Sequence, residues 1–429
     1  MKTSEQTHAE IEPRSLLRPQ RLHPLGDSRR TPWDQVGNII AWPIAIGFII
    51  HRLFILGVQA TTTDDFRLVY EALNRFWHGE PIYAADYATY QPHYLYMPGA
   101  TVLLSPIGWS DSFSIARFIF VAINALAIVS ALAIFTRMFG YSLRSLVFPT
   151  SIVMAFWSES VTNTLSFGNI NGLMLLIFAW TLYGFLHNQR WLTGVLLGIL
   201  ILIKPVFVVL LFIPAALLWW QTFIGAIAIP LLFNIVGWKI TVGASDYLNV
   251  VVPFLRNTRD HANVSWQGIT VAFGIEGAAA QAIWLIFALV LFFALLASLP
   301  LRRHQPVLWL TVASAMLLLG GYFLPSLGQG YYSMFFFPLF FSVLLPNSPA
   351  RSAWIWISFF LIYSPDSWIT AKWPIGTYYV NMYMVSFGWA MMIIFLGTYS
   401  LTLFFNAQRR TKALSNPHTT SKEPAVAAA

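Results

Sequence analysis

The chain has 429 residues, of which 57% are hydrophobic, 16% aromatic and only 10% charged, and its mean hydropathy is +0.64. About a quarter of the residues in a soluble domain are charged, and such a domain cannot hide this much apolar surface because much of its own surface faces water. The composition therefore excludes a water-soluble enzyme, a disordered chain and a nucleic-acid-binding domain. It indicates a polytopic membrane protein.

The net charge of +8 comes mostly from basic residues in the tails and short loops. This is the positive-inside pattern of membrane proteins, and it is a better explanation than nucleic-acid binding. Residues 1–35 and 406–429 are polar and basic, so we expect two flexible cytoplasmic tails. Two ends on the inside require an even number of spans. The chain contains no cysteine, which excludes thiolate metal sites and cysteine nucleophiles.

Apolar segments follow one another from 36 to 405, the expected membrane domain. Helices satisfy their backbone hydrogen bonds in lipid without partners, so we expect an all-α protein with about twelve transmembrane helices across a ~30 Å hydrocarbon core. The expected spans are 36–60, 113–136, 145–160, 171–187, 191–204, 205–220, 223–241, 277–299, 306–324, 331–346, 352–365 and 379–405. The stretch 191–220 can be two short helices or one kinked helix, because Lys204-Pro205 interrupts it.

An adjacent pair of carboxylates, Asp64 and Asp65, follows the first span directly. Thr63 or Asp64 can cap a short helix over 66–78 that ends at Gly79. Its apolar stripe predicts that this helix lies on the membrane surface, with the pair at the outer mouth of the membrane domain. The pair can supply a catalytic base, or its members can be helix caps only.

Three cationic elements are expected on the same outer face. Lys204 lies in an almost wholly apolar stretch, where a cation is costly and usually has a function such as pairing with an anionic headgroup. Its alternative is snorkelling to the interface. Arg256, Arg259 and His261 form a second cluster, and Arg117 stands near the start of the second span. Each can be an interfacial anchor, but together they favour an anionic substrate.

Aromatic and polar residues are concentrated in three expected outer segments, 81–99, 158–171 and 325–332. Aromatic faces with polar tips suit sugar stacking, although they also suit the lipid interface. Asn and Gly in these segments can be ordinary turn residues. The candidates for binding sugar and acceptor are His93, Tyr94, Tyr96, Glu159, Asn169, Asn171, His261, Gln329 and Tyr332.

These parts fit glycosyl transfer from a lipid phosphate sugar. Cations stabilise the departing phosphate, and a carboxylate takes the proton of the acceptor hydroxyl. The sequence has no HExxH, Walker A or GxGxxG pattern, so we expect no metal and no cofactor. The alternative of another class is a membrane transporter, for which paired broken helices and internal symmetry would be expected.

Several stretches resemble glycosyltransferase family 87 of the GT-C superfamily. The first are D-D-F-R-L-V-Y at 64–70, Y-L-Y-M-P-G at 94–99 and G-N-I-N-G-L-M-L-L at 168–176. N-T-R-D at 257–260 and G-Q-G-Y-Y-S-M at 328–334 are similar to the actinobacterial arabinofuranosyltransferases of that family. The mannosyltransferases of the family tend to have a histidine pair near the second of these stretches.

The resemblance implies a GT-C fold with short juxtamembrane helices in the outer loops, set in the inner (plasma) membrane with the active site on the periplasmic face. It implies inverting, metal-independent α-1,3-arabinofuranosyl transfer from decaprenyl-phosphoryl-arabinofuranose to cell-wall arabinan. The base would be Asp64 or Asp65, and the donor phosphate would lie near Lys204, Arg256, Arg259 and Arg117. A polyprenyl-phosphate-mannose donor is the alternative within the family. The oligomeric state stays open.

Overall fold

The computed structural model describes residues 22, 25, 32–57, 65–89 and 93–415. All regular structure in these residues is helical, which confirms the predicted all-α class. Six helices in this part of the chain are long and apolar enough to cross a membrane, and they support the prediction of a membrane protein. They are α1 with the π-helical turn after it (Asp34–Leu56), α4 (Phe113–Met138), α10 (Trp220–Ile240), α13 (Gly277–Ser298), α15 (Pro306–Phe323) and the Pro374–Asn406 part of α18 (Pro374–Ser415).

Shorter apolar helices of 10–17 residues occupy the other expected spans. They are α5 (Val147–Trp157), α7 (Asn171–Leu186), α8 (Arg190–Ile203), η4 with α9 (Pro205–Leu217), η6 to η7 (Gly330–Leu344) and α17 (Ala353–Tyr363). A single unbroken crossing needs about 20 residues. By length, the described chain therefore has six candidate spans, and the count of about twelve stays a prediction.

The interruption at Lys204-Pro205 separates two helices, which is the first of the two predicted alternatives. α8 ends at Ile203, Lys204 is extended with φ −132° and ψ 102°, and the 3-10 helix η4 begins at Pro205. Proline disfavours the helical conformation of the preceding residue and has no N–H for the ladder. The break therefore places Lys204 at a helix end inside the apolar stretch.

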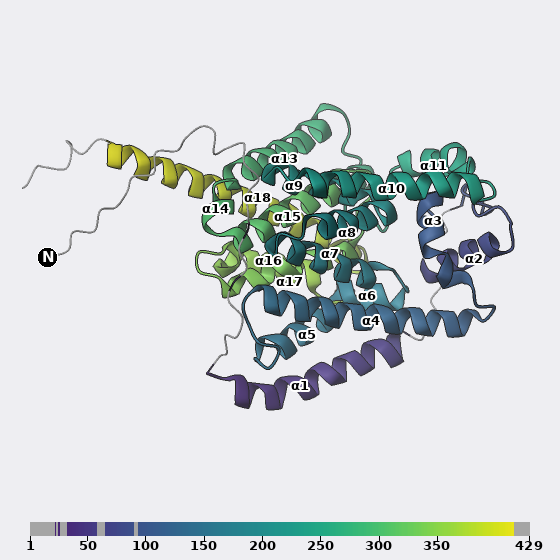
Figure 1. Ribbon diagram of the computed structural model, residues 1–429, viewed down its shortest axis with the longest axis horizontal. Helices are drawn as coiled ribbons and strands as arrows, with labels where there is room; N and C mark the ends of the chain where they lie inside the picture. The colour runs from purple at the N-terminus through teal and green to yellow at the C-terminus, as the bar shows by residue number, and fades with distance from the viewer. Residues whose placement is uncertain (1–21, 23–24, 26–31, 58–64, 90–92, 416–429) are drawn as a thin grey trace, which may run out of the picture.

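Protein covers the long helices to very different extents. In the most apolar window of α15, 89% of the residues are buried, whereas in that of α1 the share is 6%. α15 packs against α13, α18 and η4. α1 runs along the edge of the molecule, beside α5 (Figure 1). α15 is thus a central helix of the bundle and α1 a peripheral one.

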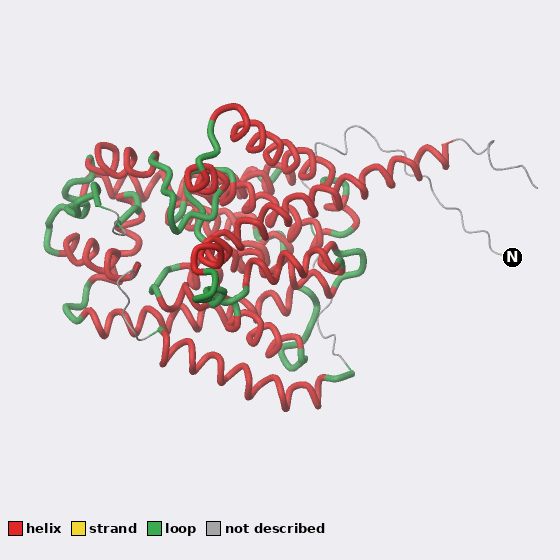
Figure 2. The backbone as a smooth tube through the Cα atoms, turned by 180° about the vertical axis from the view of Figure 1, so that it is seen from behind, coloured by secondary structure: helices red, strands yellow, loops and turns green. Residues whose placement is uncertain are grey.

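A small outer cluster of helices lies at one end of the bundle (Figures 1 and 2). Its members are α2 (Asp65–Trp77), α3 (Pro98–Leu104) and α11 (Val252–Arg256). α2 confirms the helix predicted over 66–78, and Gly79 follows it with φ +69°. Phe66 packs its ring 4.8 Å from Phe120 and 5.8 Å from Phe113, both on α4. The apolar stripe of α2 therefore docks on protein.

Two glycines bring the backbones of α3 and α10 into contact. A Cβ on Gly99 would lie 2.6 Å from the Asn234 nitrogen, and one on Gly237 would lie 2.4 Å from the Pro98 carbonyl carbon. The Asn234 side-chain oxygen also accepts a hydrogen bond of 3.1 Å from the Gly99 N–H. This contact anchors the segment that precedes α3. The sequence did not predict α3, which has only seven residues and begins with Pro-Gly.

The opposite end of the molecule carries the start of α1, the short helix α14 (Leu301–His304) and the end of α18 (Figure 1). α18 continues past residue 405 to Ser415, so the first part of the predicted C-terminal tail is helical. Arg302 and Arg303 lie in α14. Basic residues and both described chain ends therefore share the end remote from α2, α3 and α11.

Candidate active site

A cavity of about 450 Å³ lies between the outer cluster and the bundle. Its volume is within the ordinary range of about 300–1,000 Å³ for small-molecule sites. The wall combines α2, the segment 93–96, the break between α8 and η4, the end of α15 and the loop that leads into η6. The polar residues in the wall are Asp65, His93, Tyr94, Tyr96, Asn169, Lys204, Tyr247, Tyr322, Ser326, Tyr331 and Tyr332.

Asp65 brings a carboxylate into this wall from the first turn of α2. Its Oδ2 accepts a hydrogen bond of 2.7 Å from the Asn169 amide and one of 3.3 Å from the Tyr331 hydroxyl. The helix N-terminus favours a negative charge at this position. The carboxylate is therefore oriented by two neutral donors. Its predicted alternative, Asp64, lies outside the described residues.

Lys204 lies in the same wall and is held by neutral groups. Its Nζ donates to Asn171 Oδ1 at 2.6 Å and to Asn169 Oδ1 at 3.4 Å. It also lies 4.4 Å from the ring centroid of Tyr332, within cation–π range. Among the described residues no carboxylate forms an ion pair with this ammonium. Because Lys204 lines the cavity, its charge faces the space in which a ligand would bind.

Asn169 links the carboxylate and the ammonium. Its Nδ2 donates to Asp65, and its Oδ1 accepts from Lys204 and from the backbone N–H of Asn171. One amide thus holds an acid group from α2 and a basic group from the end of α8 at the same cavity. The sequence named Asp65, Lys204, Asn169, Asn171 and Tyr332 as separate candidates, and the structure brings them together.

The three residues predicted at 93–96 also belong to the wall. His93 stacks on Tyr87 with ring centroids 4.5 Å apart, and its Nε2 lies 3.1 Å from the Thr89 carbonyl. The Tyr94 hydroxyl shares a hydrogen bond of 2.8 Å with Thr101. His93 and Tyr94 are therefore fixed by protein contacts and shape the cavity, and Tyr96 lies next to them.

Arg117 and Glu159 lie outside the cavity wall. The buried guanidinium of Arg117 donates to the backbone carbonyls of Gly57 and Ser166, the second at 2.8 Å. Glu159 begins α6 (Glu159–Ser166), so the span predicted over 145–160 ends before it, at Trp157. Its carboxylate accepts a hydrogen bond of 3.2 Å from the backbone N–H of Asp366. Burial, and secondly the charge of Asp366, raise the pKa of Glu159 to about 7.

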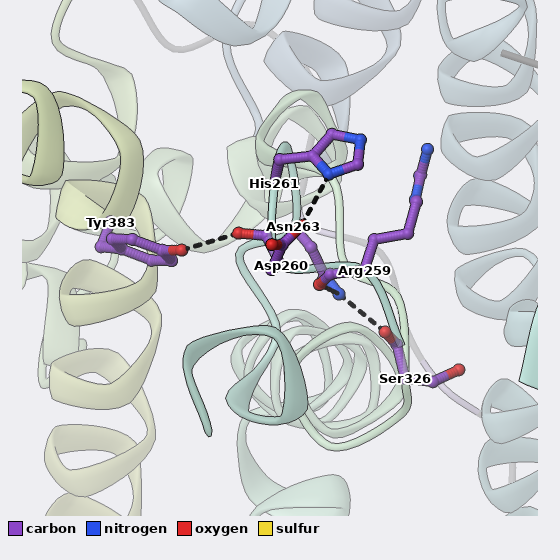
Figure 3. Close-up of polar contacts among 6 residues, drawn as sticks. All are labelled: Arg259, Asp260, His261, Asn263, Ser326 and Tyr383. Carbon is purple, nitrogen blue, oxygen red and sulfur yellow. Dashed lines mark hydrogen bonds and ion pairs between the residues drawn. The ribbon is translucent and has the colours of Figure 1, made fainter. Parts of the chain in front are cut away.

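The remaining predicted residues surround the cavity without lining it. Arg256 is exposed at the end of α11. His261 forms an exposed pair with Asp260, 2.8 Å from Nδ1 to Oδ1 (Figure 3), and this hydrogen bond lowers the pKa of Asp260. Arg259 lies in the same loop, and its backbone carbonyl accepts a hydrogen bond of 3.1 Å from Asn263. Gln329 caps η6 and accepts a backbone hydrogen bond from Tyr332.

Sequence reasoning missed three tyrosines of the wall, Tyr247, Tyr322 and Tyr331. Tyr331 could have been predicted from the sequence, because it adjoins the candidate Tyr332 in the Gly-Gln-Gly-Tyr-Tyr stretch. Tyr247 follows a turn and Tyr322 closes an apolar helix, and nothing in their spacing marks a site. Together with Tyr94, Tyr96 and Tyr332 they give the cavity faces for stacking and hydroxyls for hydrogen bonds.

The charged groups of the cavity can act together on two reactants. A carboxylate and an ammonium, joined through one amide, face a cavity whose other walls are largely aromatic and aliphatic. Such a pair can take a proton from one reactant and stabilise negative charge on another. Within the described ranges, no three His, Asp or Glu side chains come together in a way that would hold a metal ion.

Comparison with known proteins agrees with this chemistry. The model of glycosyltransferase family 87 matches residues 94–325. A Corynebacterium glutamicum protein named alpha-(1->3)-arabinofuranosyltransferase is 40% identical over 392 residues, which cover 91% of this chain and 94% of that protein. Proteins of the same name from Mycolicibacterium smegmatis (37% over 366 residues, 83% of each chain) and Mycobacterium tuberculosis (33% over 358 residues, 82% of each chain) also match. On its sequence and on its relatives, the chain belongs to glycosyltransferase family 87.

Proposed function

We propose that the protein is an inverting arabinofuranosyltransferase. It transfers arabinofuranose from a polyprenyl-phosphate donor, decaprenyl-phosphoryl-arabinofuranose, to a growing cell-wall arabinan and forms an α-1,3 branch. The observation that carries the proposal is the Asp65–Asn169–Lys204 arrangement in one cavity. The printed names of three relatives, each at least 33% identical, support the sugar and the linkage.

Asp65 is the base in this mechanism. An acceptor hydroxyl attacks the anomeric carbon of the donor while its proton passes to the Asp65 carboxylate. The new bond joins the acceptor oxygen to that carbon, and the bond from the carbon to the phosphate oxygen breaks. A single displacement inverts the configuration, so a β-linked donor gives an α-linked product. Asn169 and Tyr331 hold the carboxylate in place for this step.

Lys204 acts on the leaving group. The polyprenyl phosphate departs as an anion, so it needs charge stabilisation rather than a strong acid. An ammonium that is already fixed by Asn169 and Asn171 supplies this without reorganisation. Burial between helices strengthens the attraction, because the dielectric there is low. Arg259, in the neighbouring 259–265 loop, supplements this charge.

The proposed setting is the inner (plasma) membrane, with a GT-C fold of about twelve crossings in which the shorter helices complete the spans. The active site faces the periplasm and both termini are cytoplasmic. Two observations support this orientation. The basic α14 and the described ends of the chain lie opposite the outer cluster and its cavity (Figure 1). An apolar groove between helices would receive the polyprenyl tail.

A transfer assay tests the proposal. Purified protein in detergent or lipid is offered decaprenyl-phosphoryl-arabinose or polyprenyl-phosphoryl-mannose against a short arabinan acceptor, with EDTA present. We expect arabinose transfer that EDTA does not abolish. Mannose transfer would retain the family and reject the sugar, and loss of transfer with EDTA would reject the metal-independent mechanism. Transfer of neither sugar by a stable protein would favour a transporter.

A further inference from the structure

One buried amide joins two loops beside the cavity. Asn263 is 1% exposed, and its side chain makes four hydrogen bonds. Its Nδ2 donates to the carbonyls of Arg259 at 3.1 Å and Ser326 at 2.7 Å, and its Oδ1 accepts from the backbone N–H groups of Ser265 at 3.2 Å and Gly328 at 2.9 Å. Figure 3 shows the hydrogen bond from the Asn263 amide to Ser326. Four bonds exhaust what one amide side chain can make.

Other contacts make the same junction tight. The Val264 N–H donates to the Gly328 carbonyl at 2.8 Å, beside the Asn263 bonds. A Cβ on Gly268 would lie 2.5 Å from the Asn263 side chain, so the helix after the loop packs directly on the amide. Tyr383 on α18 donates to the Asp260 carbonyl at 3.1 Å (Figure 3). The loop that carries Arg259 is thus fixed on two sides.

Both joined segments serve the cavity. Ser326 belongs to its wall, and the same segment continues to Tyr331, which donates to Asp65, and to Tyr332, which lies over Lys204. The other loop carries Arg259, whose backbone carbonyl accepts one of the Asn263 hydrogen bonds. A shift of the junction would move the tyrosines and Arg259 relative to Asp65 and Lys204.

We propose that Asn263 is a positioning residue of the transferase. It locks the 259–265 loop, which carries Arg259, to the 326–328 loop, so that Tyr331 and Tyr332 face the phosphate end of the donor in one fixed arrangement. This inference rests on the proposed function. The Asn263-Val264-Ser265 stretch reads as a glycosylation sequon, but both hydrogens of its amide are in use inside the protein.

The test uses Asn263→Asp, which keeps the shape and the two acceptor bonds but loses the two donor bonds and sets a carboxylate against two carbonyls. Asn263→Ala removes all four bonds without adding a charge. Ser265→Ala is the matched control, because it removes the side-chain cap of α12 (Trp266–Phe273) from the same loop and leaves the Asn263 bonds in place.

Two readouts separate positioning from folding. Backbone hydrogen exchange should rise in peptides covering 258–266 and 325–332 of the Asn263 variants and not in peptides of α4. The donor KM should rise about tenfold or more, with a smaller change in acceptor KM, since small misplacements near a site are costly. In an Arg259→Ala background, the Asn263 substitution should raise the donor KM by a smaller factor, because the effects of coupled residues do not add.

Unchanged hydrogen exchange at both loops would overturn the inference. So would an equal rise in donor KM and acceptor KM, combined with effects of the Asn263 and Arg259 substitutions that simply add. Ser265→Ala should lower the melting temperature and leave the donor KM unchanged. The same donor effect in Ser265→Ala would assign the loss to the loop as a whole and also overturn it. Exchange needs no sugar, so it decides the junction even if the wild-type protein transfers no arabinose.

Discussion

At the scale of single residues, the adjacent aspartates should separate sharply. Asp65→Asn should lower kcat by about a hundredfold to ten-thousandfold, the usual contribution of a general base, because its carboxylate lines the cavity. Asp64→Asn should transfer almost normally. Initial rates at saturating donor and acceptor measure both variants. Full activity in both would show that the base lies elsewhere, and an inactive Asp64→Asn beside an active Asp65→Asn would reverse the assignment.

Lys204 should act on the donor. Lys204→Ala should raise the donor KM and lower kcat while changing the acceptor KM less, because the ammonium faces the cavity and is held there by the neutral amides of Asn169 and Asn171. Lys239→Ala, which removes an exposed cation from the last turn of α10, is the control. Equal loss of donor and acceptor use in Lys204→Ala would indicate a folding role.

The sequence predicted which residues belong to the site better than it predicted the contacts between them. Asp65, Lys204 and Asn169 stand out because polar groups are costly near an apolar bilayer. Their junction depends on contacts between residues more than 30 positions apart, which no local pattern encodes. Arg117 shows the opposite problem. A cation near the start of a span looks the same in sequence whether it binds a substrate or, as here, backbone carbonyls.

At the scale of elements, the contact between α3 and α10 should be intolerant of a methyl group. Gly237→Ala sets a Cβ 2.4 Å from the backbone of α3, so one helix must move. We expect a lower melting temperature, equivalent to about 1–3 kcal/mol, and faster exchange in α3. Gly47→Ala, in the interior of α1 with nothing within 4 Å, is the control and should be neutral or slightly stabilising. Equal stability of the two variants would contradict the contact.

The link between α6 and the 364–373 loop should be sensitive to pH. Burial raises the pKa of Glu159 from 4.5 to about 7, so between these values the folded protein holds a proton that the unfolded chain has released. Stability contributed by this group is therefore full below pH 4.5 and falls as pH rises towards 7. Glu159→Gln should flatten the fall in melting temperature across that window.

The matched control for this pH dependence is Glu80→Gln, in the exposed loop that follows α2. Its melting curve should follow the wild-type profile. A Glu159→Gln protein with the same pH profile as the wild type would show that the carboxyl titrates equally in the folded and unfolded chains. The buried link to Asp366 would then be absent in solution.

Element type was more predictable than element length. Apolar runs marked every long helix, because lipid demands helices, and Pro205 marked the break. Helix length was less predictable, since segments such as α5 and α17 have only 11 residues of unbroken helix. Whether such a helix ends at a loop or continues after a turn depends on packing against neighbours.

At the scale of the whole molecule, the absence of cysteine allows a clean test of orientation. Ala85→Cys places a thiol in the exposed loop after α2, and His304→Cys places one in α14 at the other end. A membrane-impermeant thiol reagent should label the first variant in intact cells and the second only after permeabilisation. The reverse pattern would invert the proposed orientation, and the unmodified protein is the blank.

The different burial of α15 and α1 should affect how fast their sequences change in evolution. Nearly every position of the α15 window is enclosed by other side chains, whereas those of α1 mostly face outwards. A substitution in α15 must fit neighbours of fixed shape, so accepted changes there should arrive in compensating pairs. Along α1 few other side chains are in contact, so a candidate membrane span there needs mainly apolar character. Among related proteins, the sequence of α1 should therefore vary more than that of α15, although both helices stay hydrophobic.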